Sequence, residues 1–346
     1  MSINFGVIGA SGIADRRTIP EGIIPASNAN LVAVMGRSEQ RTRHVAEKYG
    51  VKWYLKEEEL LDDKEVEAVY IATPNYLHAQ QTLSAIRAGK HVLCEKPMAM
   101  NTKEAEKMIE EAEKNERKLA IGYMMRFHAW HQKLKQMIES GEIGTPVMGR
   151  AELTCWYPRI EDAWRQDPSL GGGGALFDMG SHCIDLLEML LGRTVEITAF
   201  TDTIVQDYPV EDSSVVILHF ENGAMGFVDA HFNVPDSASV NLLEIYGSKG
   251  RVEGRGTIGQ ESTGKMTAVL ETGKKEYDAE QERSEAVQKV IEPEQVVNIY
   301  QAEIEDFCKA IALDRKPLVS GEEGLRNLKL LNAAYKSART GKTIKV

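Results

Sequence analysis

Glycines follow the first apolar run of the chain in a pattern that could bind phosphate. The run Ile3–Ile8 leads directly into Gly9-Ala10-Ser11-Gly12-Ile13. A glycine turn between a strand and a helix lets the backbone approach a pyrophosphate, and the helix N-terminus adds N–H donors. Ser11 stands where the usual fingerprint has its second glycine, and its hydroxyl could donate a hydrogen bond. The pattern predicts dinucleotide binding by Gly9, Ser11, Gly12 and Ile13, and the alternative is a tight turn without a ligand.

The end of the second apolar run carries basic residues where a ribose would lie. Leu31–Met35 is followed by Gly36-Arg37-Ser38, and Arg41 comes about one helical turn later. A cofactor without a 2′-phosphate is expected to meet an Asp or Glu at this position, and the sequence has neither. Guanidinium and hydroxyl groups suit a 2′-phosphate. The sequence therefore favours NADP(H), bound by Arg37, Ser38 and Arg41. NAD(H) is the alternative, with Arg37 only covering an adenine ring.

Two further turns follow apolar runs and place polar side chains near one another. Thr73-Pro74-Asn75-Tyr76-Leu77-His78 follows one run, and Cys94-Glu95-Lys96-Pro97 follows the next. In a doubly wound sheet both turns lie at carboxyl ends of strands, where ligands bind. A lysine held beside a cofactor can act as an acid or base, although a lone lysine is usually a solvated surface residue. We expect Lys96 to be catalytic. The expected cofactor contacts in these turns are Thr73, Pro74, Asn75, His78, Glu95 and Lys96.

A second cluster follows the four consecutive glycines at 171–174. Asp178 and His182 are four residues apart in a helical pattern, and Asp185 follows three later, so the three share one face. A carboxylate one turn from a histidine can set its tautomer and raise its basicity. The alternatives are a flexible glycine link and a capping acid beside a histidine satisfied within the fold. Because Lys96 as an acid or base is expected to have a partner group, we expect Asp178 and His182 to act with it.

The elements that must position these residues alternate between strand and helix in the first third of the chain. Unbroken apolar strands indicate a parallel sheet covered on both faces. The strand-like runs are Ile3–Ile8, Leu31–Met35, Ala68–Ala72, His91–Leu93 and Leu119–Ile121. The helical segments are Glu39–Tyr49, His78–Ala88 and Thr102–Asn115, the last with Asn101 as its N-cap. Pro20 and Pro25 predict a short or broken helix in the first crossover. Residues 1–122 are therefore predicted to form a doubly wound α/β Rossmann domain.

From residue 123 onwards, strands follow one another with few helices between them. The helical stretches are Trp130–Ser140, Phe177–Leu191, Val296–Leu313 and Glu322–Thr340. The strand-like segments are Gly149–Trp156, Val195–Ile204, Ser214–Phe220, Met225–Phe232 and Val240–Tyr246. Asn222-Gly223 predicts a hairpin turn, and the polar residues 257–293 predict sheet edges and loops. Residues 123–346 are predicted to form an α/β domain with a large, mostly antiparallel open sheet.

The composition argues against several classes of protein. The chain has 346 residues, enough for about two domains, and 41 Lys and Arg against 52 Asp and Glu give a net charge of −11. That charge argues against a broad nucleic-acid surface, and no apolar run is long enough to cross a membrane. The cysteines form no CxxC pair, and His128 and His131 lack further ligands nearby, so we expect no metal. Without a signal peptide before the first strand, we expect a cytoplasmic protein that binds neither nucleic acid nor membrane.

Together these motifs resemble those of the Gfo/Idh/MocA oxidoreductases, named for glucose-fructose oxidoreductase and inositol dehydrogenase. The matching segments span nearly the whole chain and are 6–14, 73–78, 89–97, 164–165, the glycine run with 178–185, and 246–250. The resemblance implies that Lys96 is the catalytic lysine, that His182 is its partner and that Asp178 orients the substrate or His182. It also implies that Arg126 lies near the nicotinamide and substrate, and that the open sheet often forms the subunit interface. Ser11, Arg37 and Ser38 resemble the NADP-using branch, which includes an anhydrofructose reductase and a xylose dehydrogenase.

We therefore expect an enzyme that transfers hydride between NADP(H) and a sugar, cyclitol or related keto or hydroxy compound, as a homodimer or homotetramer. Lys96 and His182 would handle the hydroxyl proton. The expected substrate contacts are Lys96, Trp156, Trp164, Arg165, Asp178 and His182. The two tryptophans could equally pack in a core or an interface. The alternative function is a non-catalytic NAD(P)-binding sensor on the same fold, although a sensor has no need of an acid/base set.

Overall fold

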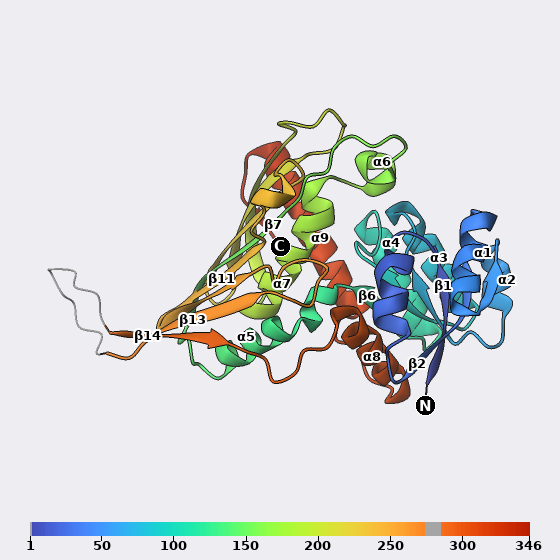
Figure 1. The fold of residues 1–346 in the computed structure, drawn as a ribbon. Coiled ribbons are helices and arrows are strands. Elements are labelled where there is room, and N and C mark those ends of the chain that lie inside the picture. Colours follow the sequence, from blue (N-terminus) through green and yellow to red (C-terminus); the bar gives the residue numbers. More distant parts are fainter. Residues whose placement is uncertain (1, 274–284) are drawn as a thin grey trace.

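The computed structural model describes residues 2–273 and 285–346, whose strands form two separate sheets. Figure 1 shows the N-terminal sheet with its helices at one end of the molecule and the second sheet at the other, with helices α7 (Ser181–Leu191) and α9 (Gly321–Thr340) between them. The prediction of a Rossmann domain followed by a C-terminal α/β domain is confirmed.

The first sheet is parallel throughout, in the order β3-β2-β1-β4-β5-β6. Its strands are β1 (Ile3–Ile8), β2 (Ala29–Met35), β3 (Lys52–Tyr54), β4 (Ala68–Ile71), β5 (His91–Glu95) and β6 (Leu119–Gly122). Every residue of β4 and β6 is buried, as expected for strands covered on both faces. Strand order reverses between β1 and β4, and in such sheets ligands bind beyond the carboxyl ends of the strands at that point.

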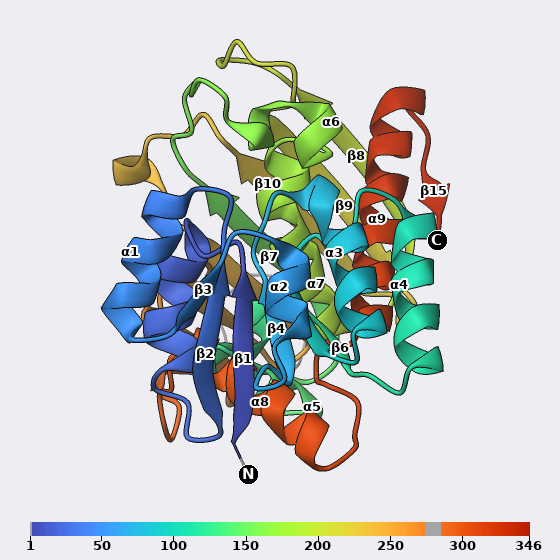
Figure 2. The same cartoon turned by 90° about the vertical axis from the view of Figure 1, so that its right-hand side faces the viewer.

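Helices join these strands (Figure 2). They are α1 (Glu39–Tyr49), α2 (Glu57–Asp62), α3 (Asn75–Arg87) and α4 (Thr102–Lys114). The predicted cap of α4 is confirmed, because the Asn101 side chain accepts from the Glu104 N–H at 3.1 Å. Strand β3 and helix α2 were not predicted. β3 has only three residues, two of them exposed, and carries no apolar run that the sequence pattern could show.

The first crossover differs from its prediction in form. It is one continuous π-helix of ten residues, η1 (Ala14–Ile23), with Pro20 inside it, rather than a short or broken helix. Proline removes an N–H and crowds the preceding turn of an α-helix. The wider turn accommodates Pro20 without ending the helix, and the Ile24 N–H bonds to the Ile19 carbonyl five residues back.

The second sheet has nine strands in the order β14-β13-β12-β11-β7-β10-β9-β8-β15. They are β7 (Pro146–Thr154), β8 (Thr194–Asp202), β9 (Ser213–Phe220), β10 (Met225–His231), β11 (Leu242–Gly247), β12 (Gly250–Arg255), β13 (Lys265–Glu271), β14 (Ala286–Ile291) and β15 (Ile344–Lys345). Neighbouring strands are antiparallel except β7 and β10. The hairpin at Asn222-Gly223 joins β9 to β10, and Gly223 has a φ of +86°. The predicted edge segment 257–293 contains β13 and β14, and its residues 274–284 lie outside the described part.

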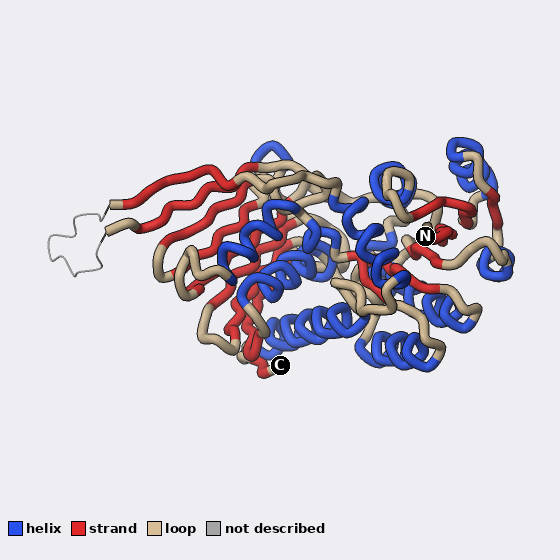
Figure 3. The backbone as a smooth tube through the Cα atoms, turned by 90° about the horizontal axis from the view of Figure 1, so that it is seen from below, coloured by secondary structure: helices blue, strands red, loops and turns tan. Residues whose placement is uncertain are grey.

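Helices cover one face of this sheet (Figure 3). α7 (Ser181–Leu191) packs on β7, and α9 (Gly321–Thr340) packs on β8. α5 (Ala129–Glu139) lies beside α7, and the short helix η4 (Leu176–Gly180) leads into α7 as a π-helical turn. The other face exposes apolar side chains, among them Phe200 at 69%, Met225 at 55% and Ile217 at 46% exposed. The sheet is therefore open on one side, as predicted.

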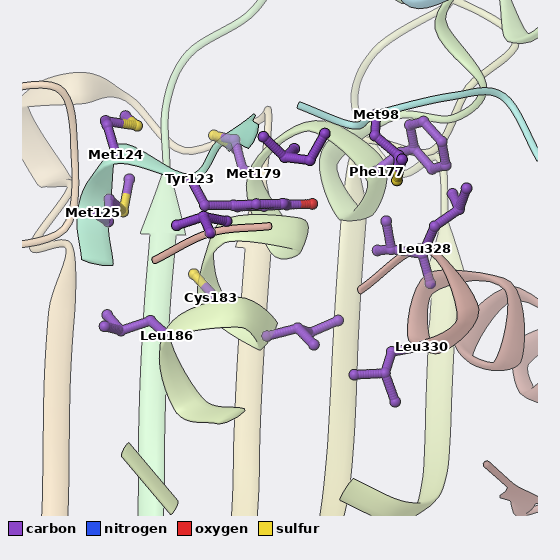
Figure 4. Packing of buried hydrophobic residues seen from close by; sticks show 14 of the residues in the cluster. Met98, Tyr123, Met124, Met125, Phe177, Met179, Cys183, Leu186, Leu328 and Leu330 are labelled. Carbon is purple, nitrogen blue, oxygen red and sulfur yellow. The ribbon is translucent and has the colours of Figure 1, made fainter. Parts of the chain in front are cut away.

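The two halves share parts of their cores. α8 (Ile299–Ala312) packs against η1, and Phe307 lies 6.2 Å from Phe5 of β1 between ring centres. Figure 4 shows Tyr123, Cys183 and Leu330 in the apolar layer that joins the end of β6, α7 and α9. In the described ranges, no helix has the length and apolar character that a membrane span requires.

Candidate active site

A cleft opens beyond the carboxyl ends of β1, β2 and β4, with a cavity of about 210 Å³. Its lining includes Gly9, Ser11, Arg37, Ser38, Arg41, Thr73 and Pro74, all predicted cofactor contacts. A Cβ on Gly9, at φ +92°, would lie 2.8 Å from the Ala72 carbonyl. A Cβ on Gly12, at φ +67°, would meet no atom within 4 Å. The glycine turn and the open space beside Gly12 fit a pyrophosphate in the cleft. Gly12 and Ile13 lie immediately before η1, so the N-terminus of this helix faces the turn.

The far end of the cleft is positively charged. Ser38 is the N-cap of α1, and its hydroxyl accepts from the Arg41 N–H at 3.5 Å. Arg37 and Arg41 are exposed, and within the described ranges neither forms an ion pair with a carboxylate. Two guanidinium groups beside a helix N-terminus are suited to an anionic group.

The turn after β4 holds the two domains together. Asn75 is buried, and its side-chain amide donates to the Gly171 carbonyl at 2.7 Å. His78 is 1% exposed, with Nε2 at 2.8 Å from the Thr73 carbonyl and Nδ1 at 2.9 Å from the Pro97 carbonyl. Both side chains were predicted to contact the cofactor. In this structure they instead join the segments that line the site, and a direct contact with the cofactor stays a prediction.

Lys96 and Asp178 meet across the domain boundary. The Lys96 ammonium donates to the Asp178 carbonyl oxygen at 2.7 Å and to its Oδ1 at 2.8 Å. Arg165 Nε lies 3.7 Å from Asp178 Oδ2. Burial works to raise the pKa of Asp178, but the charges of Lys96 and Arg165 outweigh it and hold that pKa well below its usual value. Asp178 is therefore an anion that fixes the lysine, leaving one ammonium N–H for another acceptor.

His182 lies beside this pair as a neutral imidazole. It is buried, and its ring meets the Tyr123 ring edge-on at 5.6 Å between centres. Burial lowers the pKa of His182 well below its usual value, and the charge of Lys96 adds to the effect. The charge of Asp178 acts to raise the pKa of His182, as expected, but burial and Lys96 outweigh it. The Asp178 carboxylate itself pairs with Lys96 and Arg165.

Glu95 lies at the end of β5, behind Lys96. The Tyr70 hydroxyl donates to its Oε1 at 2.5 Å, and the Lys96 backbone N–H donates to its Oε2 at 3.2 Å. Burial raises the pKa of Glu95. Tyr70 is a partner that the sequence did not indicate, because it stands in an unbroken apolar run.

The carboxylates of Asp185 and Glu323 bind the Arg126 guanidinium. The guanidinium donates to both oxygens of Asp185 at 2.8 and 2.7 Å, and to Glu323 at 2.8 Å. The Arg126 side chain is 9% exposed and that of Asp185 is 2% exposed. Asp185 shares the helix of His182 but serves this ion pair. Nε and Nη2 of Arg126 are engaged by these carboxylates, and its contact with the cofactor stays a prediction.

Two tryptophans of the second domain were predicted to contact the substrate. Trp164 stacks with Arg165, whose guanidinium carbon lies 4.2 Å from the ring centre. Trp156 is 44% exposed at the end of β7, and its backbone N–H donates to Asp236. Such exposed aromatic surface suits stacking on a sugar ring. Within residues 2–273 and 285–346, no group of three His, Cys, Asp or Glu side chains could hold a metal ion.

The fold and the cleft define a Rossmann-type dinucleotide-binding protein whose second domain completes the site. Residues 3–123 match the family model described as "Oxidoreductase family, NAD-binding Rossmann fold". Residues 135–346 match the model described as "Oxidoreductase family, C-terminal alpha/beta domain". The chain belongs to the Gfo/Idh/MocA family of oxidoreductases, as the motifs predicted.

Relatives of known activity align over nearly the full chain. The 1,5-anhydro-D-fructose reductase of Ensifer adhaerens is 30% identical, over 99% of this chain and 98% of that protein. The myo-inositol 2-dehydrogenase of Thermotoga maritima is also 30% identical, over 99% and 98%. Among solved structures, the aldose-aldose oxidoreductase of Caulobacter crescentus in complex with glycerol has a TM-score of 0.89 at 28% identity, and each chain is fully covered.

Proposed function

We propose that this protein is an NADP(H)-dependent oxidoreductase that acts on a CH–OH group of a sugar, cyclitol or related keto or hydroxy compound. The observation that carries the proposal is the Lys96 ammonium, held by Asp178 at the same edge of the sheet as the dinucleotide cleft. The substrates named for the two relatives that are 30% identical, an anhydro sugar and a cyclitol, support this chemical class. The exposed Trp156 ring and the stacked pair Trp164–Arg165 would contact the substrate.

Lys96 and His182 would form the acid/base pair. When bound, the nicotinamide supplies the acceptor or donor of a hydride. Two of the Lys96 ammonium protons are engaged by Asp178, so the third N–H would be the donor to the substrate oxygen. In the direction of reduction, Lys96 would protonate the developing alkoxide, and His182 would pass a proton on to Lys96. In oxidation the proton would take the reverse path through Lys96, with the neutral imidazole of His182 as its acceptor.

An assay with purified protein tests the proposed function. Reduced-nicotinamide absorbance would be followed with NADP and NAD against aldoses, inositols and sugar acids, and with NADPH and NADH against keto sugars. We expect turnover with one chemical class, faster with NADP(H). Tight cofactor binding without turnover across the panel would contradict the enzyme proposal and favour a sensor.

The preference for NADP(H) rests on Arg37 with Ser38 and Arg41. A relative from Haloferax volcanii, 28% identical over 99% of both chains, is named D-xylose 1-dehydrogenase (NADP(+)) 2. Arg37→Ala should raise the Kd of NADPH by about 10–100-fold, the effect of losing a hydrogen bond to a charged group, and leave the Kd of NADH nearly unchanged. Arg43→Ala, on the helix α1 that follows Arg37, is the matched control, since Arg43 is paired with Glu47. Tighter binding of NADH than NADPH by the unaltered protein would contradict the preference.

We also propose a homodimer or homotetramer assembled through the open face of the second sheet. The exposed Phe200, Ile217 and Met225 side chains on that face support the proposal, since exposed apolar patches mark interaction sites. The four cysteines are all free, which agrees with the cytoplasmic location that we propose.

A further inference from the structure

The glycine run before Asp178 is packed against protein. A Cβ on Gly174 would overlap the Glu211 carbonyl oxygen, and a Cβ on Gly173 would overlap the Tyr335 hydroxyl. A Cβ on Gly171 would lie 3.1 Å from the Arg165 backbone. At these three positions, close packing against the loop after β8, helix α9 and the segment of Arg165 accounts for the glycines.

Glu211 binds the start of the helix that carries Asp178 and His182. Its Oε2 accepts from the Gly174 N–H at 3.0 Å, and its Oε1 accepts from the Leu176 N–H at 3.0 Å. Its backbone carbonyl accepts from the Ala175 N–H at 3.0 Å. These three consecutive N–H groups open the continuous helix formed by η4 and α7, and a carboxylate there also opposes the positive end of the helix dipole. One residue therefore binds three of the N–H groups at the start of the helix.

The Glu211 carboxylate is itself fixed by α9. The Tyr335 hydroxyl donates to its Oε1 at 2.7 Å, and the Tyr335 and Phe177 rings lie 6.4 Å apart between centres. Glu211 thus joins three elements: its own loop between β8 and β9, the glycine run and α9. None of these contacts is local in sequence, since Glu211 lies 35 residues from Leu176 and 124 from Tyr335.

The first turn determines where Asp178 presents both of its acceptors. The Asp178 N–H bonds to the Gly174 carbonyl at 3.0 Å, directly after the Gly174 N–H held by Glu211. The Lys96 ammonium donates to the Asp178 backbone carbonyl as well as to its carboxylate. The position of the ammonium therefore depends on the backbone of Asp178 and not only on its side chain. A shift of the first turn would move both acceptors at once.

We propose that Glu211, supported by Tyr335, is a positioning residue for the Lys96–Asp178 pair. It fixes the first turn of η4, and through Asp178 it fixes the direction of the remaining Lys96 N–H. The catalytic consequence rests on the proposed function, whereas the effect on Lys96 itself does not. A displacement of this pair by about 1 Å would misalign the proton transfer, and such displacements cost up to about 100-fold in rate.

The test uses Glu211→Gln, which keeps size but turns one acceptor into a donor facing a backbone N–H. Acetylation of Lys96 by a trace of acetic anhydride would be measured by mass spectrometry, relative to the exposed Lys103 in the same molecule. Release of the Lys96 ammonium from Asp178 should raise that ratio by about fivefold, the size expected for one lost hydrogen bond. In the substrate assay, kcat should fall by about 10–100-fold with the Kd of the cofactor unchanged.

Glu188→Gln is the matched control for a merely structural effect. Glu188 is buried at the opposite end of α7, where it accepts from the Thr194 N–H at 2.7 Å and pairs with Arg326. Its replacement should lower stability comparably and leave both the Lys96 labelling ratio and kcat unchanged. Tyr335→Phe removes one donor to Glu211. Like Glu211→Gln, it should raise the labelling ratio and lower kcat, each by a smaller factor. It decides the question should Glu211→Gln fail to fold.

Two results would overturn the proposal. One is a labelling ratio in Glu211→Gln and Tyr335→Phe equal to that of the unaltered protein. The other is an unchanged kcat in an active enzyme that carries Glu211→Gln. Absence of any turnover in the unaltered protein would instead refute the proposed function, and the labelling ratio, which needs no substrate, would still decide whether Glu211 positions Lys96.

Discussion

Lys96→Met is expected to lower kcat by about 10²–10⁴-fold, the usual effect of removing one acid or base. Methionine has an unbranched side chain one atom shorter than lysine, and it has no N–H to offer the substrate oxygen. The Asp178 carboxylate would lose its closest cation and retain Arg165 at 3.7 Å. The cofactor Kd should stay within a few-fold, because the lining of the dinucleotide cleft comes from the ends of β1, β2 and β4.

Lys90→Met provides the control for losing a buried lysine. The Lys90 ammonium, in the same domain, donates to the carbonyl oxygens of Asp63 and Val66 at 2.9 and 2.7 Å. That variant should lose stability while each folded molecule keeps its kcat. Steady-state kinetics with the best substrate of the panel gives kcat for both variants. Near-normal turnover by Lys96→Met would remove Lys96 from the acid/base role.

The cofactor half of the site could be predicted because its signals are local. A strand, a glycine turn and the next crossover are contiguous, and Gly9, Ser11 and Arg37 do line one cleft. The carboxyl ends of parallel strands meet at one edge of the sheet, so the turns at Thr73 and Lys96 could also be placed near one another. The apolar runs were long enough to predict β1, β2, β4, β5 and β6.

The individual bonds within the site could not be predicted, because they join residues far apart in the sequence. The sequence grouped Asp178 and His182 with Lys96, but it did not show that the Asp178 carboxylate would bind Lys96, 82 residues away, rather than His182. Helical spacing placed Asp185 with Asp178 and His182, whereas Arg126, 59 residues away, binds it. Four glycines in a row indicated either a link or a ligand loop. Only the tertiary structure shows that Glu211 and Tyr335 occupy the space beside two of them.

Arg126→Met is expected to lower the free energy of unfolding by about 3–5 kcal/mol, the typical cost of breaking a buried ion pair. The loss arises because Asp185, with a side chain 2% exposed, would keep a charge without its two hydrogen bonds. Arg193→Met is the matched control. Arg193 binds the same Glu323, but its side chain is 48% exposed, so its removal should cost less than about 1 kcal/mol. Urea unfolding of the three proteins measures the difference.

The double variant Arg126→Met with Asp185→Leu separates the two roles considered for Arg126. If the guanidinium serves the fold, removal of both charges should recover most of the stability, because replacing a buried ion pair by apolar side chains is often neutral. Glu323 would retain Arg193 as its partner. The Kd of the cofactor should then match that of the unaltered protein. A loss of stability below about 1 kcal/mol in Arg126→Met, together with a cofactor Kd raised by about tenfold or more, would instead support the nicotinamide contact that the family resemblance implies.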